Sequence, residues 1–500
     1  MAGADGAAEG RGAGGGGGPA TPGGGAAGGG PGRGAGRAAG GLHRSLRLRD
    51  LVVYGLLFIA PMAPVGIYGT LQARSHGAIA LVYVVATVAM AFTAVSYAQM
   101  VRVAPRAGSV FTYARLGLGE APGFVAGWMA MLDYLLIPAV AYLFTGIAME
   151  SLVPQVDQWV WTAVAVVVTT ALNLLGVRTA AVAGFAVLTL EVVVLLVFVG
   201  AAVYVLAVDG PRHGWASPFS GEGGFSVTAV LSAVSVAVLS YLGFDAVASF
   251  AEEAEGGGRR VARAVLTCLV LAGVLFAAQT YLAALLTPTS ARELAARPAE
   301  QGDAFYVTAN SAVGEWLQKL VAASKAIGAA FAALAGQAAA GRLLFAMARE
   351  RRLPRPMAKV DAGSGAPRRS LLVAAVITLV AAVWAARRDD GLDRLSSIVN
   401  VGALTAFALL HAAVVGWFVV RRGGAEGGGR LRPLVHLVVP VLGFAVVVAV
   451  LVNASGTALV VGGVWLGVGL LVLLLQAVRG GGAGDGGAHR DAAGTGGGGR

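Results

Sequence analysis

Residues 240–263 read SYLGFDAVASFAEEAEGGGRRVAR and place a glycine and an acid inside an apolar segment. The apolar run at 225–250 has about 26 residues, and at about 1.5 Å per residue it is long enough to cross a bilayer. Gly243 and Asp245 lie inside this run, roughly 10 Å from its charged end at Glu252. A carboxylate at that depth is costly unless it is paired, protonated or facing water. We therefore predict a functional role for this segment; the alternative is that Asp245 only holds neighbouring helices together.

The composition of the chain defines its class. Hydrophobic residues make up 57% of the 500 residues and charged residues 13%, and the mean hydropathy is +0.75. These values predict an all-α polytopic membrane protein and exclude an enzyme with a large soluble half. The net charge of +11 comes from basic residues clustered between apolar runs, so we expect no nucleic-acid partner. Cys268 is the only cysteine and the six histidines have no ligand spacing, so we predict no disulfide, metal site or cofactor.

The apolar residues fall into about twelve spans separated by short polar connections. Basic residues concentrate on every second connection, and the positive-inside rule places these connections and both termini in the cytoplasm of a plasma-membrane protein. The segments 1–41 and 479–500 are rich in glycine and alanine and are predicted to be disordered cytoplasmic tails of a domain at 45–478. The approximate limits of the spans are 48–71, 77–101, 123–150, 158–176, 180–208, 225–251, 261–287, 314–347, 371–386, 395–420, 433–452 and 456–478.

The first span carries a second interruption, FIAPMAPVGIYG at 58–69. Pro61, Pro64, Gly66 and Gly69 fall close together there, and two prolines so near each other cannot both keep the helical hydrogen bonds. We expect the helix to break; a simple proline kink is the alternative. Spans one and six are corresponding members of two five-helix halves of opposite orientation. Interrupted segments at matching positions of inverted repeats indicate the central site of a transporter.

Three segments carry a resemblance to the amino acid–polyamine–organocation permeases. The segment 240–265 resembles the sixth-helix signature of the family, in which a GFD or GFE break precedes a Glu-rich end, a turn and basic residues. The segment 104–138, APRAGSVFTYARLGLGEAPGFVAGWMAMLDYLLIP, is similar to its second loop and third helix, and GRLLFAMARERRLP at 341–354 to the end of its eighth helix. The string LDYLLIP at 132–138 most resembles the putrescine-importer branch.

The resemblance covers about 45–425 and implies a LeuT-like fold. Such a fold has two inverted five-helix repeats, here about 48–208 and 225–420, with helices one and six broken. Two trailing helices at about 433–478 complete the expected set.

The break at 62–67 departs from the family pattern. Many members have a glycine- and serine-rich break whose free N–H groups hold a substrate carboxylate, and here Pro64 removes one donor. The remaining amides still offer a half-helix N-terminus to a carboxylate. At the other break, the aromatic rings of Tyr241 and Phe244 are candidate gate or cation–π groups, with packing as the alternative. We predict that substrate binds between the breaks at Ala63, Val65, Gly66, Ile67, Tyr241, Gly243, Phe244 and Asp245.

Two further acids, Asp133 in span three and Glu191 in span five, are placed near the bilayer midplane by their distance from the span ends. Related permeases often have a lysine near the position of Glu191, and some proton-coupled members use it in place of sodium. Glu191, Asp245 and Asp133 are our proton-coupling candidates. The alternatives are a protonated Glu191 bonded across helices and an Asp133 that only orients helix three. Lys325 is interpreted as snorkelling to the interface near the outer end of span eight.

The coupling ion and the substrate class follow from the charges within the spans. The segment GAAFAALAGQAAAG at 328–341 has no hydroxyl oxygens for a cation, so sodium coupling is disfavoured, and proton coupling or uniport remains. Three acids near the midplane, with no Arg or Lys deep in the first seven spans, produce a field that attracts cations. The prediction is a proton-coupled secondary transporter of amino acids or related amines, working by alternating access. The alternatives are a putrescine or polyamine importer specifically, a twelve-helix transporter of another fold, and a non-transporting receptor; no oligomeric state is predicted.

Overall fold

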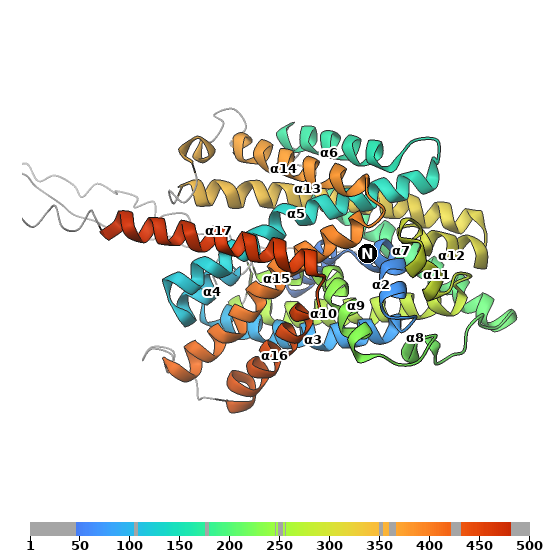
Figure 1. The fold of residues 1–500 in the computed structure, drawn as a ribbon, viewed down its shortest axis with the longest axis horizontal. Coiled ribbons are helices and arrows are strands. Elements are labelled where there is room, and N and C mark those ends of the chain that lie inside the picture. The colour runs from blue at the N-terminus through green and yellow to red at the C-terminus, as the bar shows by residue number, and fades with distance from the viewer. Residues whose placement is uncertain are drawn as a thin grey trace, which may run out of the picture. The chain divides into compact units, whose positions relative to one another are not determined.

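The computed structural model describes residues 47–104, 109–175, 180–245, 247–248, 254–255, 257–349, 354–359, 367–421 and 432–481. The predicted N-terminal tail, residues 482–500 of the predicted C-terminal tail, and Glu252 lie outside this part of the chain. The described residues form helices joined by turns, which confirms the prediction of an all-α protein (Figure 1).

Within the part of the chain that the structure describes, ten helical segments are long and apolar enough to cross a membrane, and two shorter apolar helices, Gln158–Leu174 and Val227–Tyr241, fall at predicted spans four and six. The ten segments and the two shorter helices coincide in sequence with the twelve predicted spans. The helices at the twelve predicted spans are α1 (Leu48–Ile59) with α2 (Tyr68–Arg74), α3 (Ile79–Val103), α5 (Glu120–Leu152), α6 (Gln158–Leu175), α7 (Ala180–Val208), α9 (Val227–Ala237), α10 (Gly257–Leu286), α13 (Glu315–Arg349), α14 (Arg368–Ala386), α15 (Gly391–Val415), α16 (Val439–Val452) and α17 (Gly456–Gly481).

The remaining elements are short and mark the breaks and the connections. They are α4 (Ser109–Leu118), α8 (Ser217–Ser220), α11 (Ala291–Ala296), α12 (Ala304–Ala312), the 3₁₀ turns η1 (Ala63–Ile67), η2 (Val238–Tyr241), η4 (Pro298–Gln301) and η5 (Arg355–Ala358), and the π turns η6 (Gly416–Val420) and η7 (Leu434–Val438). The last helix continues to Gly481, beyond the predicted limit at 478.

Close packing around α5 organises the bundle. α5 lies along α13 and α15, and α10 lies along α3 (Figure 1). Small residues permit the close approach: a Cβ added at Gly402 of α15 would lie 2.8 Å from the carbonyl oxygen of Met129 on α5. Helices in a membrane associate through such packing because lipid gives no hydrophobic drive between them.

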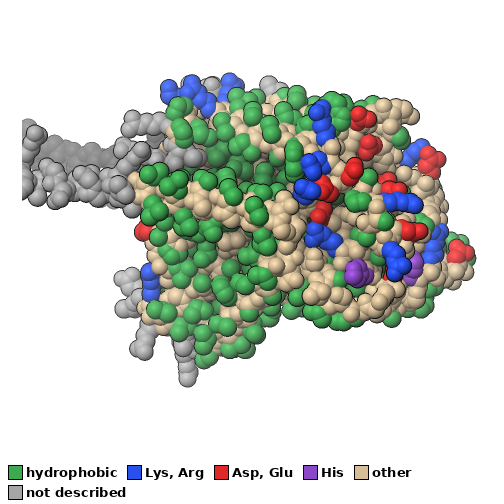
Figure 2. Space-filling model, in the orientation of Figure 1, with side chains coloured by type: hydrophobic (Ala, Val, Ile, Leu, Met, Phe, Trp, Pro, Cys, Tyr) green, Lys and Arg blue, Asp and Glu red, His purple; other side chains and the backbone are tan. Residues whose placement is uncertain are grey.

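The outer faces of the helices are apolar. Val167, Leu196, Val376 and Val464 each expose at least 60% of their surface, as expected for side chains that face lipid chains. Figure 2 shows hydrophobic side chains along the length of the helices, whereas side chains of both charges gather at the end where Figure 1 labels α2, α11 and α12.

Candidate functional site

Helix one is broken, as predicted, rather than kinked. α1 ends at Ile59, and Ala60 adopts a left-handed φ of 57° before the chain continues as the 3₁₀ turn η1 and then α2. A positive φ at a non-glycine residue is uncommon and marks a true change of chain direction. Pro61 and Pro64 explain the change, because neither can donate a helical hydrogen bond.

The carbonyl groups freed by this break are satisfied by side chains from other helices. Gln279 Nε2 on α10 donates to the Pro61 carbonyl oxygen at 3.0 Å. Lys325 Nζ on α13 donates to the Met62 carbonyl oxygen at 3.1 Å. Irregular backbone at membrane depth is tolerated only where the protein meets its hydrogen-bonding needs in this way.

Helix six is interrupted beside the first break. The 3₁₀ turn η2 ends at Tyr241, Leu242 is extended, and Gly243 adopts a φ of 108°, which favours glycine. A Cβ added at Gly243 would lie 2.9 Å from the Phe58 carbonyl oxygen. The two breaks therefore touch, and only glycine fits at their contact.

The predicted carboxylate nest on helix one is partly used by the protein itself. Val65, Gly66 and Ile67 are buried, Ala63 is half-buried, and the Val65 N–H donates to the Met62 carbonyl oxygen at 3.1 Å. A Cβ added at Gly66 would overlap the ring of Phe144 on α5. Gly66 is thus needed for close packing, whatever its amide binds.

Both predicted aromatic gate residues are fully buried against α3. The Tyr241 hydroxyl lies 2.7 Å from Thr87 Oγ1, and its ring packs edge-on against Phe276. The Phe244 ring makes an edge contact with Tyr97, with the centroids 5.7 Å apart. In this structure the Tyr241 and Phe244 rings pack inside the bundle.

Two of the predicted acids lie near each other. The Tyr97 hydroxyl donates to Asp245 Oδ2 at 3.1 Å, and Asp245 is half-buried. Asp133 on α5 interacts electrostatically with Asp245, as does Tyr134. The Oδ1 atom of Asp133 is buried and has no hydrogen-bond partner among the described residues. These two acids therefore lie in one region beside break six.

Glu191 belongs to a different region, whose charged partner is Lys325. Glu191 is 3% exposed and its carboxylate lies against Gly328 of α13, where an added Cβ would overlap Oε1. Lys325 is 2% exposed and its Nζ lies 4.8 Å from the centre of the Phe144 ring. The prediction that Lys325 snorkels to the interface is wrong. The Met62 carbonyl oxygen, which also accepts from the Val65 N–H, provides a partner in the interior, so the ammonium points inward.

The sequence did not predict a cavity of about 600 Å³ beyond the end of α2. It is bounded by Thr70 of α2 and Ile147 of α5, and acids outnumber bases along its wall. Burial, with the Glu300 and Glu150 charges, raises the pKa of Asp303 to about 6. The only feature of the sequence that pointed to this cavity was the mixture of acids and arginines in the connections between the spans on that side. The charged lining residues are Glu150, Asp157, Asp303, Arg387, Arg388, Asp389 and Asp393.

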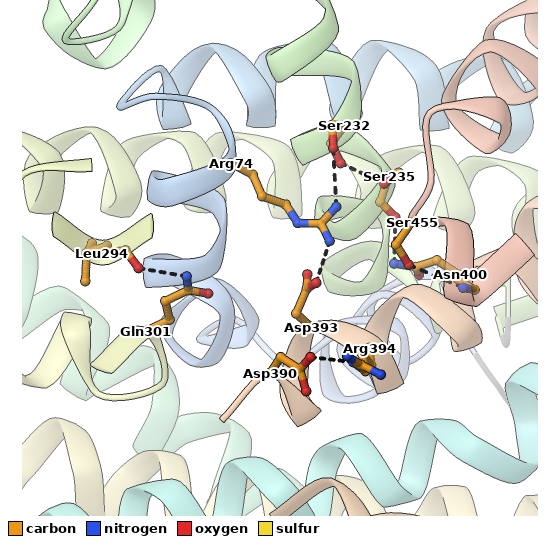
Figure 3. A network of polar contacts seen from close by, with 11 residues as sticks. Arg74, Ser232, Ser235, Leu294, Gln301, Asp390, Asp393, Arg394, Asn400 and Ser455 are labelled. Atoms are coloured by element: carbon orange, nitrogen blue, oxygen red, sulfur yellow. Dashed lines mark hydrogen bonds and ion pairs between the residues drawn. The ribbon is translucent and has the colours of Figure 1, made fainter. Parts of the chain in front are cut away.

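The sequence also did not predict an ion pair at the cavity wall. Arg74, at the end of α2, bonds to Asp393 of α15 and donates to Ser232 Oγ of α9 at 3.3 Å (Figure 3). The described residues contain no cluster of three His, Cys, Asp or Glu that could hold a metal ion.

Comparison with known proteins identifies the family of this chain. A sequence profile described as "Amino acid permease" matches residues 51–469. The low-affinity putrescine importer PlaP of Escherichia coli (strain K12) is 27% identical over 437 residues, covering 86% of this chain and 93% of that protein.

Two further relatives cover similar shares of their length. The branched-chain amino acid permease BcaP of Lactococcus lactis subsp. cremoris (strain MG1363) is 27% identical over 454 residues, covering 86% of this chain and 94% of the relative. The methylthioribose transporter of Bacillus subtilis (strain 168) is 24% identical over 455 residues, covering 87% of this chain and 93% of that transporter. These relatives are transporters rather than enzymes, and the chain belongs to the amino acid permease family of membrane transporters.

Proposed function

We propose that this permease moves an amine-bearing solute, an amino acid or a polyamine, across the plasma membrane by proton-coupled alternating access. The contact of Gly243 with the Phe58 carbonyl carries the proposal, because it brings together the breaks of helices one and six. Broken helices that meet near the midplane are the usual place for substrate in transporters built from inverted repeats. The repeats are taken as 48–208 and 225–420, with both termini cytoplasmic, and the bacterial relatives support the plasma-membrane location.

The charge near break six favours a cationic group on the substrate. Asp245 and Asp133 supply two carboxyl groups there, and among the described residues no Lys or Arg is a group that interacts with Asp133. An ammonium group would be attracted by this field. The amides of Gly66 and Ile67 remain the candidate partners of an amino acid carboxylate.

Generic amino acid transport is the first candidate and polyamine import the second. The named activities of the relatives include both classes, a branched-chain amino acid permease and a putrescine importer. The missing amide at Pro64 weakens a carboxylate anchor and adds weight to diamines. The LDYLLIP string at 132–138 points the same way.

Proton coupling is the third part of the proposal. Glu191, Asp245 and Asp133 are ionisable groups within the spans, and the helix segment at 328–341 has no hydroxyl oxygen for sodium. With the orientation given by the positive-inside rule, the cavity beside Thr70 lies on the external side and provides access to α2.

Uptake into proteoliposomes tests the proposed function. Radiolabelled amino acids and polyamines are supplied one at a time, with proton and sodium gradients imposed separately. We expect saturable uptake that an inward proton gradient stimulates and sodium does not. Uptake that strictly requires sodium would contradict the coupling, and binding without transport would favour a receptor.

A further inference from the structure

The Lys325 ammonium lies at the break of helix one with its hydrogen-bonding capacity only partly used. It donates to the Met62 carbonyl oxygen and sits over the Phe144 ring. A lysine has three N–H donors, so the hydrogen bond to Met62 leaves capacity for another acceptor. A buried ammonium is stable only with compensating charge or hydrogen bonds. The Lys325 ammonium can therefore bind a second acceptor.

Glu191 is the second acceptor within reach of this region. Its carboxylate lies against Gly328, one turn after Lys325 on the same face of α13. The two charges interact electrostatically, yet Lys325 makes its hydrogen bond to Met62. The Oε1 atom of Glu191 is buried and has no hydrogen-bond partner among the described residues. One ammonium thus has two competing acceptors, a carbonyl and a carboxylate.

The surroundings isolate this pair from other charges. Among the described residues, the charge that acts on Glu191 is that of Lys325, and the charge that acts on Lys325 is that of Glu191. α6 and α12 contain no Asp, Glu, Lys, Arg or His, and neither does α10 from Val265 to Leu286; α14 carries its charges, Arg368 and Arg369, at its start. α5 presents the Phe144 ring to Lys325. Of the three acids of α5, Glu120 pairs with Arg115, Glu150 accepts from the Gln158 N–H, and Asp133 interacts with Asp245. The charges at the start of α1, Arg49 and Asp50, pair with each other.

We propose that Glu191 and Lys325 form the coupling switch of this permease, in which a proton on Glu191 decides which acceptor holds the Lys325 ammonium. With Glu191 protonated, the ammonium stays on the Met62 carbonyl, which is the arrangement in the structure. When the proton leaves to water, the ionised carboxylate attracts the ammonium, because opposite charges interact strongly in a low-dielectric interior. The Met62 carbonyl then loses the ammonium and keeps the hydrogen bond from the Val65 N–H. The inference rests on the proposed transport function.

The switch is mechanically connected to the substrate site. Phe144 contacts the Lys325 ammonium and also fills the space against Gly66 in the helix-one break. Met62 begins the turn whose amides include the candidate carboxylate partners. Movement of the ammonium away from Met62 therefore changes the support of the break at which substrate binds. Proton binding and substrate binding would be coupled through this backbone segment.

The test compares net uptake with counterflow exchange in proteoliposomes. Glu191→Gln imitates the protonated acid, so we expect it to lose stimulation by an inward proton gradient while counterflow, which needs no net proton movement, continues. Lys325→Met leaves Glu191 buried with no opposite charge and is expected to lose both activities. The double variant Lys325→Met/Glu191→Gln removes both buried charges and is expected to reach the membrane without showing stimulation.

The matched controls are Lys319→Met and Glu315→Gln, which remove the same charges from an exposed pair on the same helix. Both are expected to keep the stimulation of the unmodified protein. Proton-stimulated uptake by Glu191→Gln, or by the double variant, would overturn the switch while leaving the proposed function intact. Absence of any amine transport by the unmodified protein would instead overturn the proposed function.

Discussion

The Arg74 guanidinium at the end of α2 is bonded to the Asp393 carboxylate of α15, with 2.5 Å between Nη2 and Oδ2 (Figure 3). Each side chain is about one-fifth exposed, 20% and 23%. Asp393 also lines the cavity beyond α2, so the pair connects the second half of the broken helix one with α15 at the cavity wall. Such a partly desolvated pair is stronger than one on an open surface.

We predict that Asp393→Asn weakens this connection and lowers transport. Loss of a hydrogen bond to a charged group costs about 1.5–3 kcal/mol, so the initial uptake rate should fall by about 10-fold or more. Asp390→Asn is the matched control, because Asp390 pairs with Arg394 within one turn of the same helix. Equal effects of the two variants would show that the Arg74 contact has no special role.

The contact between the two breaks predicts a strong effect of Gly243→Ala. The positive φ and the overlap with the Phe58 carbonyl oxygen should together cost about 1–3 kcal/mol. We expect a lower thermal midpoint in detergent and loss of uptake. Gly200→Ala is the control, because an added Cβ at Gly200 of α7 meets no atom within 4 Å. A Gly243→Ala protein as active as this control would refute the assigned contact.

Removing the charge of Asp245 separates a functional carboxylate from a packing residue. Asp245→Asn keeps the size of the side chain and most of its hydrogen bonding, so the protein should fold. Uptake should fall by about 10-fold or more if the carboxylate contacts an ammonium or carries the proton. Tyr97→Phe, which removes one hydrogen bond to Asp245, should have a smaller effect. Normal membrane levels with unmodified transport would mean that Asp245 only holds helices together.

Asp303 makes stability depend on pH. Its pKa rises from 3.8 to about 6 in the folded protein because it is buried at the cavity. An acid whose pKa is raised by folding stabilises the folded protein at pH values below the pKa that it has in the unfolded chain. That contribution is lost as the pH rises to about 6. The loss is at most about 3 kcal/mol. Thermal midpoints should therefore fall between pH 4 and 6 in the unmodified protein and stay flatter in Asp303→Asn. Parallel pH profiles would refute this assignment.

Competition identifies the substrate class. Excess putrescine and an excess neutral amino acid are each added during uptake of a labelled amino acid. If an amino acid is the substrate, the neutral amino acid should slow uptake and putrescine should not. Inhibition by putrescine alone would exclude the amino acid interpretation and favour polyamine import.

The sequence by itself determined the class of the protein and the positions of its breaks. Apolar length fixes which segments cross a bilayer, because about 20 residues are needed in any such helix. Pro61 and Pro64 interrupt the hydrogen bonds of their own turn, and Gly243 permits a positive φ, so these effects are local and can be predicted from the chain.

The tertiary structure decided which polar side chains meet. Lys325 and Met62 are 263 residues apart, and Arg74 and Asp393 are 319 residues apart. The rise per residue gives the depth of Asp133, Asp245 and Glu191 in the membrane but not the direction in which each side chain faces. Helix packing placed the Glu191 carboxylate against Gly328, one turn from Lys325, because the rotation of each helix about its axis is set by its neighbours.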